Sequence, residues 1–157
     1  MKFRIYQLFF VAIIALLVLA MSETLMTFTS TEGCGAVYTM SNFSLTAENG
    51  TISRSVVALG VVLIFAAVVN LFATLVSLFS NFELLKRTTI LSMLLLTGYY
   101  VLMLIYAFVL SDDSSIDAQL PMLYPFFALT LNLFSYLFIR KQEAKIVARA
   151  LGFRLRD

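Results

Sequence analysis

The sequence predicts an all-α membrane protein: an antiparallel bundle of four transmembrane helices, with both termini cytoplasmic and a small β-hairpin cap in the first outer loop. Of its 157 residues, 61% are hydrophobic and only 13% are charged, against about 45–50% and about 25% in soluble domains. Four apolar runs also follow one another with short polar breaks. A helix needs about 20 mainly apolar residues to cross a hydrocarbon core of ~30 Å. We therefore expect one domain over residues 1–157, formed by these runs.

The expected spans lie at about residues 8–26, 55–79, 89–110 and 121–139. Short loops join the second span to the third and the third to the fourth, which predicts two antiparallel helix pairs. The first run also resembles a secretory signal peptide, because a basic start is followed by an apolar stretch and by Ala20-Met21-Ser22. Apolar residues continue past Ser22, so we expect an uncleaved first span.

The distribution of charge predicts the orientation of the bundle. Ten of the 11 Lys and Arg residues lie before the first span, between the second and third, or after the fourth, and only Arg54 lies on the opposite side. Most of the acidic residues fall in the two remaining loops. By the positive-inside rule, both termini and the second loop are expected in the cytoplasm.

The first outer loop, about Thr27–Arg54, is expected to form two or three antiparallel strands that rest on the helix ends. Residues 40–46 alternate partly between apolar and polar side chains, which is typical of a strand. Asn49-Gly50 favours a tight hairpin turn, and Glu32-Gly33-Cys34-Gly35 can also turn the chain. An isolated hairpin is marginal in water, so its apolar face must pack on the bundle or on a partner.

Two sequence features of this loop bear on covalent chemistry. Cys34 is the only cysteine, which excludes an internal disulfide. An unpaired loop cysteine is the favoured interpretation, with pairing to another chain as the alternative. Asn42-Phe43-Ser44 and Asn49-Gly50-Thr51 match the N-glycosylation acceptor pattern, a three-residue match that is common by chance.

The cytoplasmic tail, residues 140–157, is expected to continue the fourth helix. It carries a membrane-surface basic set: Arg140, Lys141, Lys145 and Arg149. A basic amphipathic helix beside a membrane is typical of an interfacial helix held by anionic lipids. The alternative is that these cations only hold the fourth span in place, and the sequence is compatible with both.

The middle of the spans holds no Asp, Glu, Lys, Arg or His, and the chain has no histidine at all. Proton relays and ion paths in membranes use such groups, and zinc or iron sites draw on His, Cys and carboxylate clusters. We therefore expect a protein that is not an enzyme, with no catalytic residues, no cofactor and no metal.

Three polar residues in the spans are expected to make interhelical contacts: Asn70, Asn132 and Ser135. The two asparagines lie at similar depths, about 15 and 12 Å from the cytoplasmic helix ends, on faces rich in small residues. Polar side chains on such faces bond across helix interfaces. Packing is favoured over the alternative, a ligand-binding role. Tyr99 and Met103 in the third span could line an aromatic pocket, but ordinary packing is expected there too.

The two ends of the chain resemble a family of small four-span inner-membrane proteins, best represented in Bacteroidota and classified only as a domain of unknown function. The resemblance rests on Arg4-Ile5-Tyr6-Gln7 at the start, and near the end on residues 128–133, 139–143 and Arg154-Leu155-Arg156. Gln142 stands where the family usually has Asp. The resemblance implies a location in a bacterial inner (cytoplasmic) membrane. It does not point to any activity, because the family has none assigned.

These features favour a non-catalytic accessory or scaffolding subunit of a larger membrane complex. The alternative is a binder or carrier of a lipid or hydrophobic small molecule, which an open apolar cavity near Tyr99, Met103 or Asn132 would support. An intramembrane enzyme would need a water-filled pocket that converges on Glu23 or Glu83. The expected partners are membrane lipids and another integral membrane protein, without nucleic acid, and a homo-oligomer is compatible with the sequence.

Overall fold

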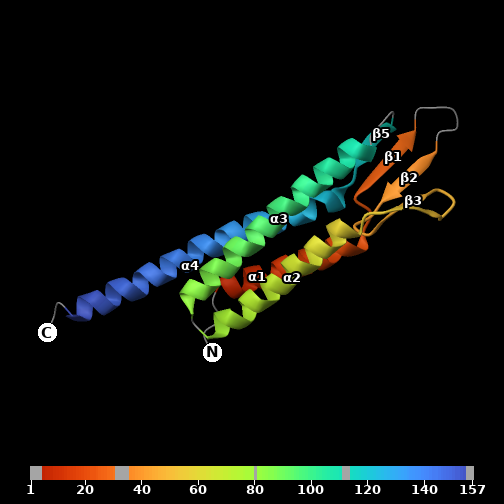
Figure 1. Cartoon of the computed structure of the whole chain (residues 1–157). Helices are drawn as coiled ribbons and strands as arrows, with labels where there is room; N and C mark the ends of the chain where they lie inside the picture. Colours follow the sequence, from red (N-terminus) through yellow and green to blue (C-terminus); the bar gives the residue numbers. More distant parts are fainter. Residues whose placement is uncertain (1–4, 31–35, 80, 111–113, 155–157) are drawn as a thin grey trace.

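A computed structural model describes residues 5–30, 36–79, 81–110 and 114–154 of the chain. Within these ranges, four long helices are apolar and long enough to cross a membrane. A small antiparallel sheet lies at one end of the helices (Figure 1). The helices are α1 (Ile5–Ser22), α2 (Val57–Leu78), α3 (Phe82–Leu110) and α4 (Tyr124–Arg154).

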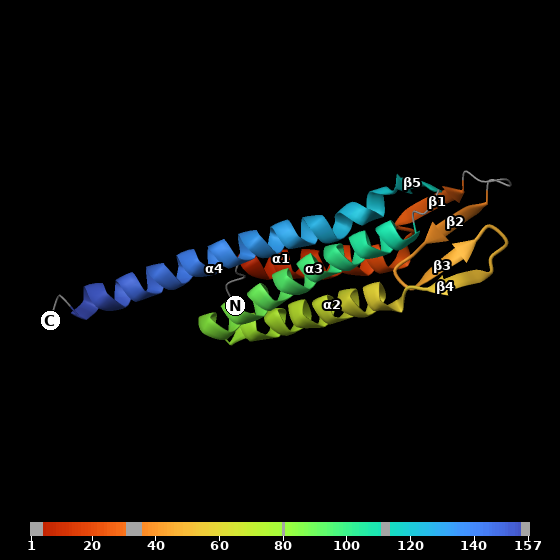
Figure 2. The ribbon, with the colours of Figure 1, turned by 45° about the horizontal axis from the view of Figure 1, so that its top comes forward.

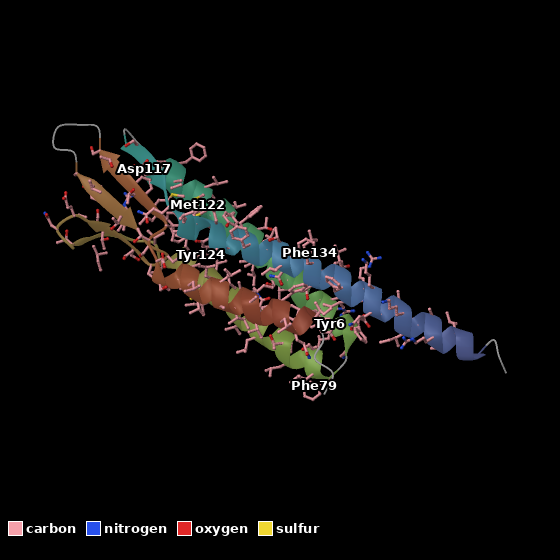
Figure 3. All side chains as sticks on the ribbon, turned by 180° about the vertical axis from the view of Figure 1, so that it is seen from behind. Tyr6, Phe79, Asp117, Met122, Tyr124 and Phe134 are labelled. Carbon is pink, nitrogen blue, oxygen red and sulfur yellow. The ribbon has the colours of Figure 1, made fainter. Side chains whose placement is uncertain are left out.

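The helices pack as a ring in which α1 and α3 each contact both α2 and α4. On α1 the fully buried residues recur every three or four positions, at Tyr6, Phe10, Ile13, Leu17 and Ala20, which places one face of the helix inside the ring. The outward faces are apolar as well, with half-exposed Leu8, Val11 and Val18 on α1. Side chains cover the outside of the bundle along its length (Figure 3). Helices that are hydrophobic all round are typical of a membrane environment.

The first span ends earlier than its apolar run. The expected boundary at residue 26 is wrong, because α1 ends at Ser22 and Met26 already begins a strand. Leu25, Met26 and Phe28 are buried, so the apolar residues after Ser22 fill the junction between the sheet and the bundle. The expected length of this span therefore included residues that belong to the sheet and to its junction with the bundle.

The sheet contains five antiparallel strands in the order β4-β3-β2-β1-β5. Its apolar face includes the buried side chains of Met26, Phe28, Met40 and Leu45, and Met26 pairs with Met40 across β1 and β2. Figure 2 shows the four strands of the segment between α1 and α2 side by side beyond the ends of these two helices. The strands are β1 (Met26–Ser30), β2 (Val37–Met40), β3 (Ser44–Ala47), β4 (Ile52–Ser55) and β5 (Ser114–Ala118).

This sheet is larger than the expected two or three strands, and the description of the fold as all-α is incomplete. The fifth strand comes from the loop after α3, which pairs with β1 along its full length, from Met26 with Ala118 to Ser30 with Ser114. Between β3 and β4 the chain turns at Gly50, whose φ is 75°, and the Gly50 amide donates to the Ala47 carbonyl at 2.8 Å. A positive φ is accommodated by glycine without steric strain.

The start of α4 accommodates both prolines of the chain. A 3₁₀ turn, η1 (Leu120–Leu123), contains Pro121 near its start, and α4 begins at Tyr124 with Pro125 in its first turn. The first turn of a helix has no internal partner for its amides, so proline is tolerated there. From this end, α4 runs along the bundle and continues past the ends of the other helices (Figures 1 and 2).

Some expectations concern residues outside the described ranges. These are the turn at Glu32–Gly35, the state of Cys34, and the positions of Lys2, Arg4, Asp112, Asp113 and Arg156.

Candidate functional site

Three polar side chains from three helices meet inside the bundle and form what we call the core triad: Asn70 on α2, Ser92 on α3 and Asn132 on α4. Nδ2 of Asn70 donates to Oγ of Ser92 at 2.7 Å, and Nδ2 of Asn132 donates to the same oxygen at 3.0 Å. All three residues are buried. Because α3 packs between α2 and α4, Ser92 joins two helices that lie on opposite sides of it.

The amide oxygens of the core triad are left without partners. Oδ1 of Asn70 and Oδ1 of Asn132 are both buried and accept no hydrogen bond from any described residue. A buried acceptor without a donor costs about 1–3 kcal/mol. Neither asparagine exposes any surface, so no space wide enough for a water molecule adjoins them. The triad is a closed structural contact that retains an energetic penalty.

A second buried polar residue, Asn42, connects the sheet to three helices. It lies in the turn between β2 and β3 and is fully buried. Its Nδ2 donates to the Ala20 carbonyl of α1 at 2.6 Å, and its Oδ1 accepts from the Tyr99 hydroxyl of α3 at 2.8 Å. Its backbone carbonyl accepts from the Gly60 amide of α2 at 2.9 Å. In this fold Asn42 is a packing residue, and its amide nitrogen is not available for modification.

Beside Asn42, the ring of Phe43 lies directly over Gly60. A Cβ on Gly60 would overlap that ring, so glycine at this position allows the turn to sit against the start of α2. The Val56 amide also donates to the Phe43 carbonyl at 3.0 Å. The β2–β3 turn is therefore attached to the beginning of α2 through backbone and side chain.

Of the three residues predicted to make interhelical contacts, two make such contacts and the third does not. Asn70 and Asn132 lie inside the bundle and are joined through Ser92 rather than directly to each other. Ser135 is also buried, but its hydroxyl donates to the Leu131 carbonyl of its own helix at 2.9 Å, and it makes no interhelical hydrogen bond to the part of the chain that the structure describes. A serine in a helix commonly satisfies itself this way.

The sequence analysis did not predict the buried contacts of Ser92 and Asn42. Ser92 follows Thr89 by three positions, and both are buried on the inward face of α3. Small polar residues at helical spacing in an apolar span are a signal for such contacts. Asn42 carried no comparable signal, because its role depends on helices that are distant in sequence.

The two residues considered for a pocket, Tyr99 and Met103, are fully buried. Tyr99 and Met103 expose no surface, and an open cavity that reached them would leave part of them exposed. The neighbouring Tyr100 donates from its hydroxyl to the Met122 carbonyl at 2.8 Å, which attaches α3 to η1. The polar ends of both tyrosines are thus used inside the chain.

Charged side chains gather at the end of the bundle opposite the sheet. Nζ of Lys86 on α3 lies 2.8 Å from Oε2 of Glu143 on α4. Arg87 pairs with Glu83 one turn earlier on α3, at 2.7 Å. The predicted basic tail residues Arg140, Lys141, Lys145 and Arg149 all lie on α4 and are exposed. Figure 3 marks the two ends of the bundle by Asp117 at the sheet and by Tyr6 and Phe79 at the opposite end.

The described residues offer amides, hydroxyls and exposed charges rather than a set of reacting groups. No cluster of three or more His, Cys, Asp or Glu side chains among them could hold a metal ion. A surface hollow of about 240 Å³ at the start of α3 contains Glu83, but that carboxylate is largely exposed and paired with Arg87. Glu23 is exposed at the end of α1.

Comparison of the chain with protein-family models and with curated proteins finds no match.

Proposed function

We propose that this protein is a non-catalytic accessory or scaffolding subunit of a larger complex in the inner membrane of a bacterium. The observation that carries the proposal is the use of the buried polar side chains. The side-chain nitrogens of Asn70 and Asn132 and the side chain of Asn42 bond to other parts of the same chain. The two amide oxygens without a partner, on Asn70 and Asn132, are fully buried and closed to a ligand. What the bundle offers to other molecules is its apolar outer surface and its exposed basic tail.

The proposed orientation has both termini in the cytoplasm. Among the described residues, Lys86, Arg87 and the basic tail lie at the end opposite the sheet, and Arg54 is the single cation at the sheet end. This asymmetry supports the positive-inside assignment. The sheet would then face the periplasm.

The alternative, a carrier of a lipid or another hydrophobic molecule, receives less support. It calls for an open cavity near Tyr99, Met103 or Asn132, and these residues expose no surface. Ligand pockets are typically concave spaces of about 300–1,000 Å³ that enclose most of the ligand. The packing of these three residues counts against such a space beside them.

The test is isolation of the tagged protein at native expression in a gentle detergent, followed by mass spectrometry of proteins and lipids. The subunit proposal expects one integral membrane protein at a reproducible stoichiometric ratio. Recovery of the protein alone with one enriched lipid would overturn it in favour of the carrier. A tagged four-span protein of unrelated sequence, expressed at the same level, controls for nonspecific membrane association.

A further inference from the structure

The outward face of α4 carries one continuous stripe of exposed side chains that changes from apolar to basic. Phe134 and Leu137 are half-exposed, and Lys141 and Lys145 follow them and are exposed as well. At about 100° per residue, these four positions fall within about 80° of one another around the helix axis. The fully buried Ile139 lies on the opposite side of the helix, so the stripe faces away from the bundle.

The stripe changes character where α4 leaves the bundle. Ile139 is the last fully buried residue of α4, and the described residues from Ala144 onward are all exposed. We call residues 140–154 the α4 extension, which forms about 22 Å of helix. The helix is unbroken from Tyr124 to Arg154, and both views show the extension continuing in the direction of the bundle (Figures 1 and 2). The basic part of the stripe therefore begins where the apolar bundle ends.

The two lysines of the stripe lie at the depth of the lipid head groups. Lys141 and Lys145 are two and six positions beyond Ile139, or about 3 and 9 Å along the helix axis. The head groups add a layer of about 5–7 Å on each side of the hydrocarbon core. Side chains of a helix lean toward its N-terminus, and α4 begins at the sheet end (Figure 2). Both lysines therefore lean back toward the bundle, and their apolar stems allow the ammonium groups to reach the phosphates.

Arg140 and Ala144 complete this surface. Arg140 and Lys141 follow Leu137 by three and four positions, so they lie on either side of it one turn further along α4. Ala144 follows Leu137 by seven positions and lies directly below it, and its small side chain leaves room between the two cations. Arg140 and Ala144 also border a shallow surface hollow of about 410 Å³. A phosphate over Ala144 would be within reach of the Arg140 guanidinium, which matches phosphate geometry with paired donors.

No carboxylate of the described residues neutralises these cations. Glu143 is the nearest one in sequence, but both of its oxygens accept from Nζ of Lys86, at 3.0 and 2.8 Å. Arg140, Lys141 and Lys145 form no ion pair within the part of the chain that the structure describes. Uncompensated cations directly below lipid-facing apolar side chains match the two parts of an anionic phospholipid, its phosphate and its acyl chains. A free phosphate would use only the basic half of the stripe.

We propose that the outward face of α4 is a binding site for an anionic phospholipid of the leaflet at the end opposite the sheet. Its acyl chains lie against Phe134 and Leu137, its phosphate is bound by Arg140 and Lys141, and Lys145 adds a further positive charge. The site lies on the surface and needs no internal cavity. It goes beyond the proposed function, because a subunit of a complex and a protein that acts alone could both carry it.

The first test compares two lipids by native mass spectrometry of the full-length protein in a neutral detergent. The protein is titrated with phosphatidylglycerol or with phosphatidylcholine that has the same acyl chains. The unmodified protein is expected to bind phosphatidylglycerol at least about tenfold more tightly, because each nearby cation strengthens the attraction to an anionic lipid. Arg140→Gln with Lys141→Gln should abolish this preference and leave phosphatidylcholine binding unchanged.

Two further variants control for charge and folding. Arg54→Gln with Arg149→Gln removes the same net charge outside the site and should retain the preference for phosphatidylglycerol. Arg140→Lys with Lys141→Arg keeps both charges in the site and should retain it as well. Thermal unfolding profiles equal to those of the unmodified protein show that each variant remains folded.

The second test identifies the occupant in the host membrane. A benzophenone amino acid is placed at Leu137, and in a control at Leu75, which is half-exposed on α2. The adducts at Leu137 should be phospholipids, with the anionic ones enriched at least about fivefold over their share at Leu75. Arg140→Gln with Lys141→Gln should remove this enrichment.

Several outcomes overturn the inference. These are equal affinity for the two lipids, equal losses in the site and control variants, displacement of phosphatidylglycerol by an equal concentration of inorganic phosphate, and a protein adduct or a second copy at Leu137. The two proposals can fail separately. A stoichiometric membrane partner without any lipid preference would leave the subunit function standing and remove the lipid site. Recovery of the protein alone, with an anionic phospholipid that the Arg140→Gln, Lys141→Gln variant loses, would do the reverse.

Discussion

The Tyr99 hydroxyl of α3 donates to Oδ1 of Asn42 at 2.8 Å, across 57 positions of the chain. Since Asn42 also bonds to Ala20 of α1 and to Gly60 of α2, one residue of the β2–β3 turn contacts three helices. The cap and the bundle therefore share a buried polar junction, and a change at Asn42 should be felt in both.

The Asn42→Asp substitution is expected to destabilise the protein at neutral pH by about 3 kcal/mol, because a buried carboxylate would face the Ala20 carbonyl without a hydrogen to donate. Protonation restores a donor, so the loss should shrink as the pH falls. Thermal unfolding in detergent from neutral to acidic pH measures this. The Tyr99→Phe variant removes one bond and should show no such pH dependence. A loss for Asn42→Asp that does not change with pH would contradict the prediction.

In the core triad, Ser92 and Asn132 are expected to be energetically coupled. Ser92→Ala removes the acceptor of the Asn132 amide and leaves that amide buried without a partner, at a cost of about 1–2 kcal/mol. In an Asn132→Ala background that amide is absent, so the same substitution should cost less, with a coupling of about 0.6–1.7 kcal/mol. The free energies of unfolding of the unmodified protein, the two single variants and the double variant, measured in mixed micelles, give this coupling. If the losses of the two single variants simply add up in the double variant, the contact between Ser92 and Asn132 contributes nothing to stability.

The contact between Gly60 and Phe43 predicts a suppressor. Gly60→Ala should displace the Phe43 ring and destabilise the turn, by about 1–3 kcal/mol for an overpacked contact. Phe43→Ala in the same chain removes the overlapping ring and should recover part of that loss. The stability of the two single variants and the double variant tests this. A double variant as unstable as the sum of the two singles would show that the ring is not the obstacle.

The Lys86–Glu143 pair is expected to order the α4 extension while adding little global stability. Its two side chains are 25% and 35% exposed, and pairs near the surface typically contribute about 0–1 kcal/mol. Lys86→Glu should speed amide exchange in residues 140–151. Adding Glu143→Lys to that variant restores opposite charges and should slow the exchange again. Unchanged exchange in Lys86→Glu would indicate that the direction of the extension does not depend on this pair.

The proposed orientation predicts which residues can be labelled from each side of the membrane. In a Cys34→Ser background, Asn49→Cys should react with an impermeant maleimide in cells whose outer membrane is permeabilised. Arg149→Cys should react only after the inner membrane is opened. The reverse pattern would show that the orientation of the bundle is opposite to the proposed one. Reaction of both cysteines from the same side would contradict the three membrane crossings expected between residues 49 and 149.

The helical part of this fold is predictable from the sequence because hydropathy and helix length are local properties. Hydropathy alone gave the wrong end for α1, because Leu25, Met26 and Phe28 are apolar residues that are buried where the sheet meets the bundle. Ser114–Ala118 carries one strongly strand-forming residue, Ile116, and becomes a strand because β1 offers a free edge. The interior positions of Asn70 and Asn132 follow from their setting among small residues. Their connection through Ser92 depends on how three helices are aligned, which no single segment encodes.

The pairing of β5 with β1 also imposes an order of assembly. Ser115 and Thr29 lie 86 positions apart, and α2 and α3 are synthesised between them. During synthesis the edge of β1 stays unpaired until α2 and α3 have both been made and Ser114–Ala118 lies on the same side of the membrane as β1. A chain in which one of the two crossings failed would leave that strand on the wrong side, with the edge uncapped. The complete sheet therefore depends on α2 and α3 running in opposite directions, because only then does the chain return Ser114–Ala118 to the end where β1 lies.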